Sequence, residues 1–123
     1  MLFFKKKKIQ QPNWIDNKID EYRDMLFDIR YDMRKNVKNI LVTEQFIKIL
    51  PNGPDKNSEE EMLEKYKYAL LCNIGSYDGV LADWRILLEG ASEEDKANMI
   101  NKNTVPKLTS HEYIKDLLFY DNK

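Results

Sequence analysis

The sequence contains one cysteine, Cys72, and one histidine, His111, among its 123 residues. A lone cysteine cannot form a disulfide within the chain, so a disulfide-stabilised secreted domain is excluded and a reducing, cytoplasmic location is expected. A catalytic histidine needs a nucleophile or a carboxylate beside it, and no local residue supplies one to His111. The sequence also lacks a glycine-rich phosphate loop and a nucleophile elbow. We therefore expect no enzyme activity, no cofactor and no metal centre.

Long apolar runs and a strong net charge are also missing. No run approaches the roughly 20 residues that a membrane-spanning helix needs. The formal net charge is −1, so the chain as a whole offers no strong field toward nucleic acid or an acidic membrane. Lysine, asparagine, aspartate, isoleucine and tyrosine are frequent, which is typical of AT-rich coding genomes such as those of phages and mobile elements.

The longest regular pattern covers residues 58–90 and predicts one long helix. Ser58 is a suitable N-cap residue, three glutamates follow it, and Gly90 suits the left-handed position after a helix end. Between these ends an apolar seam repeats at steps of three and four, as in a helix packed along its length against another. The seam consists of Leu63, Tyr66, Leu70, Ile74, Tyr77, Leu81, Trp84 and Leu88.

Two glycines within this stretch oppose a single helix, because each costs about 1 kcal/mol relative to alanine in a helix interior. The seam keeps its phase through Gly75 and Gly79, which favours a continuous helix over a break at which Ser76 caps a second helix. Small residues form a stripe that would let another backbone approach closely. The stripe comprises Ala69, Cys72, Gly75 or Ser76, Gly79 and Ala82.

Residues 14–50 predict a second long helix with a similar seam. Its apolar residues are Ile15, Ile19, Tyr22, Leu26, Ile29, Met33, Val37 and Ile40. Residues 40–50 either continue this helix, restart at Thr43 as a short helix with Phe46, Ile47 and Leu50 inward, or form a strand that has no evident partner. We favour helix throughout, with Thr43 as the place for a kink. The polar, turn-rich residues 51–58 then join the two helices into an antiparallel hairpin.

Two shorter helices are expected after Gly90. Ser92 caps the first, at about 93–101, and three acidic residues follow it. Thr109 caps the second, at about 110–120, and Glu112 completes a capping box. The predicted fold is therefore all-α: a long antiparallel helical hairpin of residues about 14–50 and 58–89, with two shorter C-terminal helices packed on it.

The first thirteen residues form an apolar and basic N-terminal arm before a single helical domain of residues 14–123. The apolar residues precede the lysines, which is the reverse of their order in a secretion signal. In one interpretation the arm docks, with its apolar side chains in a partner's pocket and its lysines on an acidic surface. In the other it is a disordered tail or a short strand folded back on the domain. Its candidate binding residues are Leu2, Phe3, Phe4, Lys5, Lys6, Lys7 and Lys8.

Aspartates recur at every fourth position of the first long helix, at Asp16, Asp20, Asp24, Asp28 and Asp32. Like charges at this spacing repel each other, although Arg23 is placed to offset Asp20. Each step of four drifts by about 40° around a helix, so the five carboxylates cannot share one metal site. The favoured interpretation is a solvated face. In the alternative, Asp20, Asp24 and Asp28 form an acidic contact strip for a basic partner.

The remaining candidates have ordinary structural explanations. Cys72 beside two leucines is expected to be a small core residue, and His111 is expected at the surface in the first turn of the last helix. Phe27, Tyr31 and Tyr68 fall off the seams, so a third helix or a partner should cover them. A thin basic cluster near Tyr31 offers, with the arm, the only candidate nucleic-acid surface. The cluster consists of Arg30, Arg34, Lys35 and Lys38.

From these patterns we expect a non-catalytic protein–protein interaction or structural subunit of a larger assembly. Its partners are then other proteins in a multi-subunit assembly, or further copies of the chain in a homo-oligomer. A phage or mobile-element origin would allow a location in the virion. One alternative is a small inhibitor or regulator that binds a basic host protein surface through its acidic helix face. A further alternative is a nucleic-acid-binding accessory protein.

Overall fold

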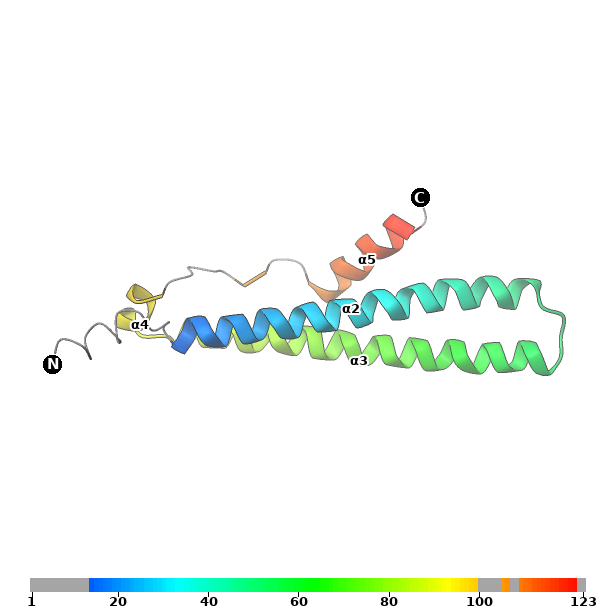
Figure 1. The fold of residues 1–123 in the computed structure, drawn as a ribbon, viewed down its shortest axis with the longest axis horizontal. Coiled ribbons are helices and arrows are strands. Elements are labelled where there is room, and N and C mark those ends of the chain that lie inside the picture. Colours follow the sequence, from blue (N-terminus) through cyan, green and yellow to red (C-terminus); the bar gives the residue numbers. More distant parts are fainter. Residues whose placement is uncertain (1–13, 100–104, 107–108, 122–123) are drawn as a thin grey trace, which may run out of the picture.

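The computed structural model describes residues 14–99, 105–106 and 109–121, and all regular structure in these residues is helical. Helix α2 spans Trp14–Ile49 and helix α3 spans Pro54–Gly90, and the two run antiparallel along their full length (Figure 1). Two shorter helices follow, α4 over Glu93–Ala97 and α5 over Ser110–Asp121. The predicted all-α hairpin with two short C-terminal helices is confirmed.

Both long helices are continuous where the sequence left alternatives open. Helix α3 passes through Gly75 and Gly79, and α2 passes through Thr43 to Ile49, so neither the break nor the strand forms. Packing explains why the glycines are tolerated, because tertiary burial of a helix face supplies most of the stability of a helix in a protein. The residues around Gly75 and Gly79 include the buried Tyr77 and Val80, which hold this part of α3 against α2.

The predicted end of α3 near Gly90 is confirmed, but its predicted start and both of its predicted caps were wrong. The helix begins at Pro54, so Ser58 lies inside it and caps nothing. Proline is well suited to the first turn, where its missing N–H has no intrahelical partner and its fixed φ is already helical. Gly90 is the last helical residue and does not take a positive φ; the chain leaves the helix instead through Ala91 in an extended conformation.

The core lies between the two predicted seams and is concentrated in one half of the hairpin. Every residue of both seams is buried or half-buried. The fully buried residues of α3 begin only at Tyr77, and beyond Val37 the only buried residue of α2 is Thr43. A fully buried large apolar side chain contributes roughly 1.5–3 kcal/mol. The half of the hairpin near the connection between α2 and α3 is therefore the more weakly anchored one.

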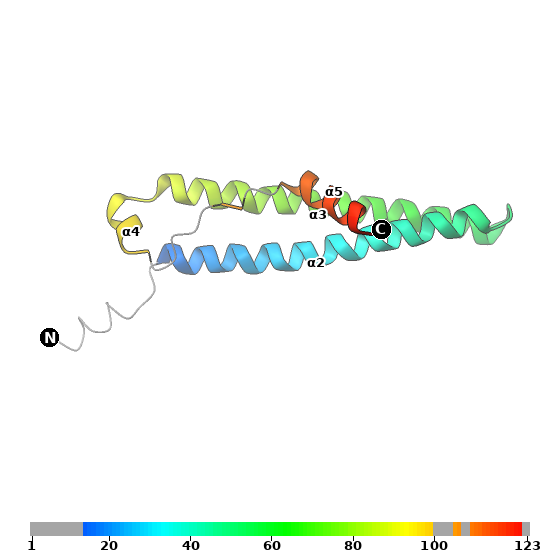
Figure 2. The same cartoon turned by 90° about the horizontal axis from the view of Figure 1, so that it is seen from above.

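Helix α5 lies across the groove between α2 and α3 (Figure 2). The ring of Tyr113 stacks on that of Tyr77, with centroids 6.1 Å apart and an angle of 7° between the planes. Arg30 of α2 donates a 2.9 Å hydrogen bond from Nη2 to the Tyr77 hydroxyl, and its guanidinium lies 5.3 Å from the Tyr113 ring centroid. Ser110 Oγ donates to Asp78 Oδ2 at 3.0 Å. These contacts fix the start of α5 on the hairpin.

The predicted caps of the two short helices are confirmed. The Ser92 side chain accepts a hydrogen bond of 3.0 Å from the N–H of Asp95. Thr109 Oγ1 accepts from the N–H of Glu112, and Glu112 Oε2 accepts from the N–H of Thr109, both at 3.2 Å. Helix α4 is shorter than predicted and ends at Ala97, since Asn98 already lies in a turn.

Candidate functional site

An exposed apolar stripe lies on α2 near the connection to α3. Val42, Phe46 and Ile49 follow one another at steps of four and three, so they share one face of the helix. With Gln45 they line a hollow of about 330 Å³, and Ile49 is 77% exposed. We call these four residues the distal patch. Single exposed apolar residues are common, whereas a contiguous exposed set is typical of an interaction surface.

The sequence analysis missed the distal patch. It placed Phe46 inward in its short-helix alternative, but Phe46 is half exposed, while Ile47 and Leu50 are half-buried as expected. The seam of α2 continues unbroken past Thr43, so Ile47 and Leu50 occupy the inner positions and Phe46 is turned outward. The i, i+4, i+7 spacing of Val42, Phe46 and Ile49 was the signal that could have revealed the patch.

A second exposed surface on α2 combines carboxylates with aromatic rings. Asp20, Asp24 and Asp28 are exposed, and Phe27 and Tyr31 lie on the same outward side, with Phe27 68% exposed. We call these five residues the acidic–aromatic strip. Within the described residues no other helix covers its two aromatic rings, so of the two predicted coverings, a third helix or a partner, covering by a partner stays a prediction. Tyr68 of α3 is exposed in the same way.

The aspartate series is not one uniform face. Asp20, Asp24, Asp28 and Asp32 are exposed, but Asp16 is buried, which contradicts a solvated position for that residue. The cause is the drift of about 40° per step, which turns the first member of the series toward the interior side of the helix. The expected pairing of Arg23 with Asp20 is present, with Nη1 3.6 Å from Oδ1.

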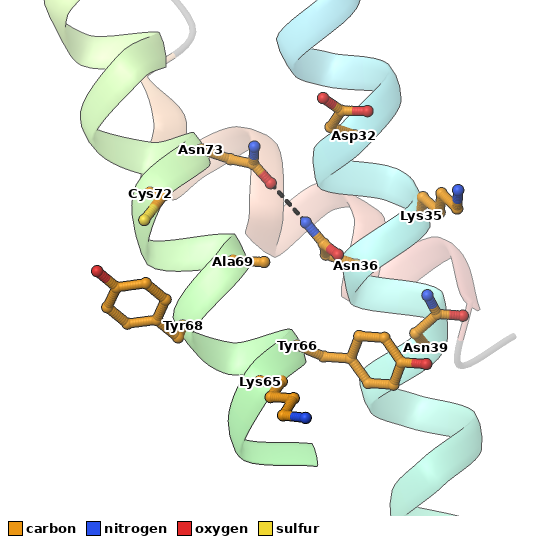
Figure 3. A pocket seen from close by; sticks show the side chains of 10 residues that line it. All are labelled: Asp32, Lys35, Asn36, Asn39, Lys65, Tyr66, Tyr68, Ala69, Cys72 and Asn73. Carbon is orange, nitrogen blue, oxygen red and sulfur yellow. Dashed lines mark hydrogen bonds between the residues drawn. The ribbon is translucent and has the colours of Figure 1, made fainter. Parts of the chain in front are cut away.

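A polar groove of about 660 Å³ lies between α2 and α3 on the side away from α5 (Figure 3). Across it, Asn36 Nδ2 donates to Asn73 Oδ1 at 2.7 Å. Both asparagines are half-buried and flank the seams, Asn36 next to Val37 and Asn73 next to Ile74, and neither was predicted as a contact between the helices. The groove is lined by Asp32, Lys35, Asn36, Asn39, Lys65, Tyr66, Tyr68, Ala69, Cys72 and Asn73.

The described residues that line the groove form no arrangement that indicates catalysis. Its one carboxylate, Asp32, lies beside amides and lysines, and its cysteine, Cys72, has no histidine among the lining residues. Cys72 is exposed, so its predicted place in the core was wrong; it lies on the outward side of α3, while the seam runs through Leu70 and Ile74. His111 lies at the surface in the first turn of α5, as expected. Among the described residues no group of three or more metal-binding side chains converges.

The predicted basic cluster is smaller than expected. Arg30 is half-buried, because its guanidinium reaches into the junction with α5, 5.5 Å from the ring centroid of Tyr77 and 5.3 Å from that of Tyr113. Arg34, Lys35 and Lys38 remain exposed. Three dispersed cations on one helix provide little of the phosphate neutralisation on which nucleic-acid binding depends.

The N-terminal arm lies outside the described residues, so the docking and tail interpretations of the arm both remain predictions. They concern Leu2, Phe3, Phe4, Lys5, Lys6, Lys7 and Lys8. Among the described helices, none is apolar enough over sufficient length to cross a membrane.

Comparison of the chain with protein-family models, with curated proteins and with solved structures finds no match. Three surfaces of the described residues are candidates for binding: the distal patch, the acidic–aromatic strip and the polar groove.

Proposed function

We propose that the protein is a non-catalytic interaction or structural subunit of a larger assembly and that it binds a partner protein through the distal patch of α2. The observation that carries the proposal is the exposure of Val42, Phe46 and Ile49 side by side on one helix face. Complete burial of a fully exposed side chain of this kind gains roughly 1.5–3 kcal/mol, and since these three are about half to three-quarters exposed, covering them together gains a corresponding part of that per residue.

The form of the patch supports a protein partner over a small molecule. All four of its residues come from one helix, so among the described residues no opposing wall encloses a ligand in the hollow. Small-molecule sites are concave and bury most of the ligand surface. An exposed row at i, i+4 and i+7 instead suits an apolar helix or groove of another protein, which contacts several turns of α2 at once.

The proposal is tested by capture of partners from the native source, with nuclease present, using the whole chain as bait. We expect one stoichiometric protein to be retained by the native chain and lost from the double variant Phe46→Gln, Ile49→Gln. Met25→Gln serves as the matched control, because Met25 is an exposed apolar residue of the same helix away from the patch. Surface substitutions change stability by about ±0.5 kcal/mol or less, so all variants should stay folded by circular dichroism.

Two outcomes would contradict the proposal. Either no protein is retained at stoichiometric amount, or the retained protein binds the double variant as well as it binds Met25→Gln. A further bait that lacks residues 2–8 tests the arm in the same experiment. Loss of the partner from that bait would identify the arm as a second contact.

A second candidate function uses the acidic–aromatic strip. In this proposal the chain is a small inhibitor or regulator whose carboxylates and aromatic rings cover a basic surface of a host protein. It is supported by the exposure of Phe27 and Tyr31 beside Asp24 and Asp28, because interface cores are enriched in aromatic residues.

The two candidates are separated by their salt dependence and by their sensitive residues. Binding through the strip should weaken steeply as salt rises and should be lost in the variant Asp20→Asn, Asp24→Asn, Asp28→Asn. Binding through the distal patch should be retained in that variant. If a captured partner binds the triple variant normally at every salt concentration, the inhibitor proposal fails.

A further inference from the structure

The outward side of α3 carries a second seam that points away from the hairpin core. Its residues follow one another at alternating steps of three and four, the spacing at which a helix contacts another helix along its length. All of them are exposed, including Tyr68 at 70% and Ile86 at 66%. We call this set the outer seam: Lys65, Tyr68, Cys72, Gly75, Gly79, Ala82, Ile86 and Glu89.

The order of side chains along the outer seam is symmetrical about position 77. Moving away from that position in either direction, a glycine comes first and a small residue second, Cys72 on one side and Ala82 on the other. A large apolar residue follows, Tyr68 or Ile86. The last position on each side is charged, with opposite signs. Lys65 stands at one end and Glu89 at the other.

We propose that the outer seam binds the outer seam of a second copy of this chain, with the two α3 helices antiparallel about a twofold axis near position 77. Each outer-seam residue then lies opposite the residue of the other copy that is equally far from position 77 on its other side. Tyr68 meets Ile86 of the other copy, and Lys65 meets Glu89 of the other copy, twice in each dimer. Such self-complementarity is what a twofold interface requires of a single surface patch.

Charge complementarity selects this arrangement over a parallel one. In a parallel pair in register, Lys65 would face Lys65 and Glu89 would face Glu89, and like charges in contact are destabilising. Within one molecule these two residues are 24 positions apart on the same helix, about 36 Å at a rise of roughly 1.5 Å per residue. Their attraction can therefore act only between copies.

The centre of the seam is open for a close approach. A Cβ atom added at Gly75 or Gly79 would meet nothing within 4 Å. Helix α5 reaches α3 through Tyr77 and Asp78 and leaves both glycines uncovered. Paired glycines four apart allow two helix backbones to pack closely, while Tyr68 and Ile86 bury apolar surface on either side. This surface is separate from the distal patch of α2, so the dimer and the proposed partner binding stand or fall independently.

Cysteine cross-linking tests the register. In the dimer, Cys72 faces Ala82 of the other copy, so the variant Ala82→Cys should form an intermolecular disulfide when oxidised with copper–phenanthroline. The two native Cys72 residues lie about 15 Å apart, beyond the roughly 7 Å limit between Cα atoms, so the native chain should not cross-link. Lys67→Cys is the control, because Lys67 is exposed on α3 but off the outer seam. Cross-linking of Ala82→Cys no faster than the control would overturn the proposal, as would efficient cross-linking of the native chain.

Charge exchange tests the contacts without a new covalent bond. Sedimentation equilibrium at low salt should give a dimer for the native chain. Lys65→Glu alone and Glu89→Lys alone should each raise the dissociation constant several-fold, and the double variant Lys65→Glu, Glu89→Lys should restore it. A native chain that is monomeric at the concentrations used for cross-linking, or a double variant no tighter than the single ones, would refute the antiparallel dimer.

Discussion

Asn36 of α2 and Asn73 of α3 face each other across the polar groove and share a hydrogen bond of 2.7 Å. Each is half-buried beside an apolar seam residue, Asn36 next to Val37 and Asn73 next to Ile74. A single polar pair of this kind costs stability compared with leucine, but it specifies register, since sliding either helix would leave both amides without their partner. The pair thus sets which residues of α2 and α3 lie opposite each other.

We expect the effects of replacing Asn36 and Asn73 on the free energy of unfolding to be non-additive. Asn36→Leu alone leaves the Asn73 amide without its partner and should lower the free energy of unfolding by about 1–3 kcal/mol. The double variant Asn36→Leu, Asn73→Leu should be close to neutral or more stable than the native chain. Urea denaturation of the three variants measures the coupling, with exposed Asn17→Leu as the control. Simple additivity of the two single changes would show that the hydrogen bond does not couple the helices.

Tyr113 should anchor α5. Tyr113→Ala removes one ring that makes two contacts, because it stacks on Tyr77 and lies near the guanidinium of Arg30. Each contact is worth roughly 0.5–1.5 kcal/mol. Amide hydrogen exchange should then speed up in α5 and stay unchanged in α2 and α3. The exposed Tyr31→Ala is the matched control and should leave α5 protected. Equal loss of protection in the hairpin would mean that α5 unfolds only together with it.

The capping box should govern the start of α5. Thr109→Ala removes the hydroxyl that accepts from the N–H of Glu112 and should cost about 1 kcal/mol. Thr109→Ser keeps an acceptor and should behave like the native chain. Hydrogen exchange at the first turn of α5 reports the difference, and identical exchange in the two variants would contradict the capping role.

Gly75→Ala and Gly79→Ala should each stabilise the isolated chain. Both positions are helical and open, so an added methyl group meets no neighbour and the substitution gains roughly 0.5–1 kcal/mol of helix propensity. Thermal unfolding at low protein concentration, where a dimer would dissociate, measures this gain. The same methyl groups would hold two outer seams apart, so association should weaken as the single chain becomes more stable. A lower melting temperature at low concentration would indicate a non-helical conformation at these glycines.

Stability should fall at alkaline pH through Lys18. The hydrogen bond of 3.0 Å to Glu21 raises the pKa of Lys18 above its ordinary 10.5. Because folding raises this pKa, the contribution is fully present below the unfolded value and disappears as the pH rises through the folded one. The effect is small since the pair is exposed. Lys18→Gln should flatten the loss of stability above about pH 10.5 in urea titrations, and an unchanged profile would contradict this assignment.

The hairpin could be predicted because its determinants are local and periodic. Two seams at steps of three and four, separated by a polar turn, specify two helices and the faces they bury. The starts of α4 and α5 are marked by hydrogen bonds between residues only three positions apart. These predicted caps, Ser92 and the pair of Thr109 and Glu112, are confirmed. Ser58 was wrongly predicted as the N-cap of α3, because the helix already begins at Pro54. Gly90 was wrongly predicted to take a left-handed conformation, because the chain leaves the helix through the extended Ala91.

The surfaces were harder to predict, because exposure depends on the other elements of the fold. The burial of Arg30 follows from the position of α5, which no local pattern specifies. Cys72 resembles a core residue by type, and only the final rotation of α3 places it outside. The sequence shows that Phe27, Tyr31 and Tyr68 lie off the seams. It does not show whether another helix covers them, because that depends on where α5 packs.

The uneven core has a consequence for how the molecule opens. Buried side chains of α3 begin at Tyr77, so the roughly six turns of α3 that precede it contribute no buried side chain to the contact with α2. Cooperative local unfolding should therefore start at the connection between α2 and α3. It should then proceed toward the start of α2 and the end of α3. The distal patch lies at this end of the hairpin. A protein bound there would shift the opening equilibrium toward the closed hairpin and would protect residues that it never touches.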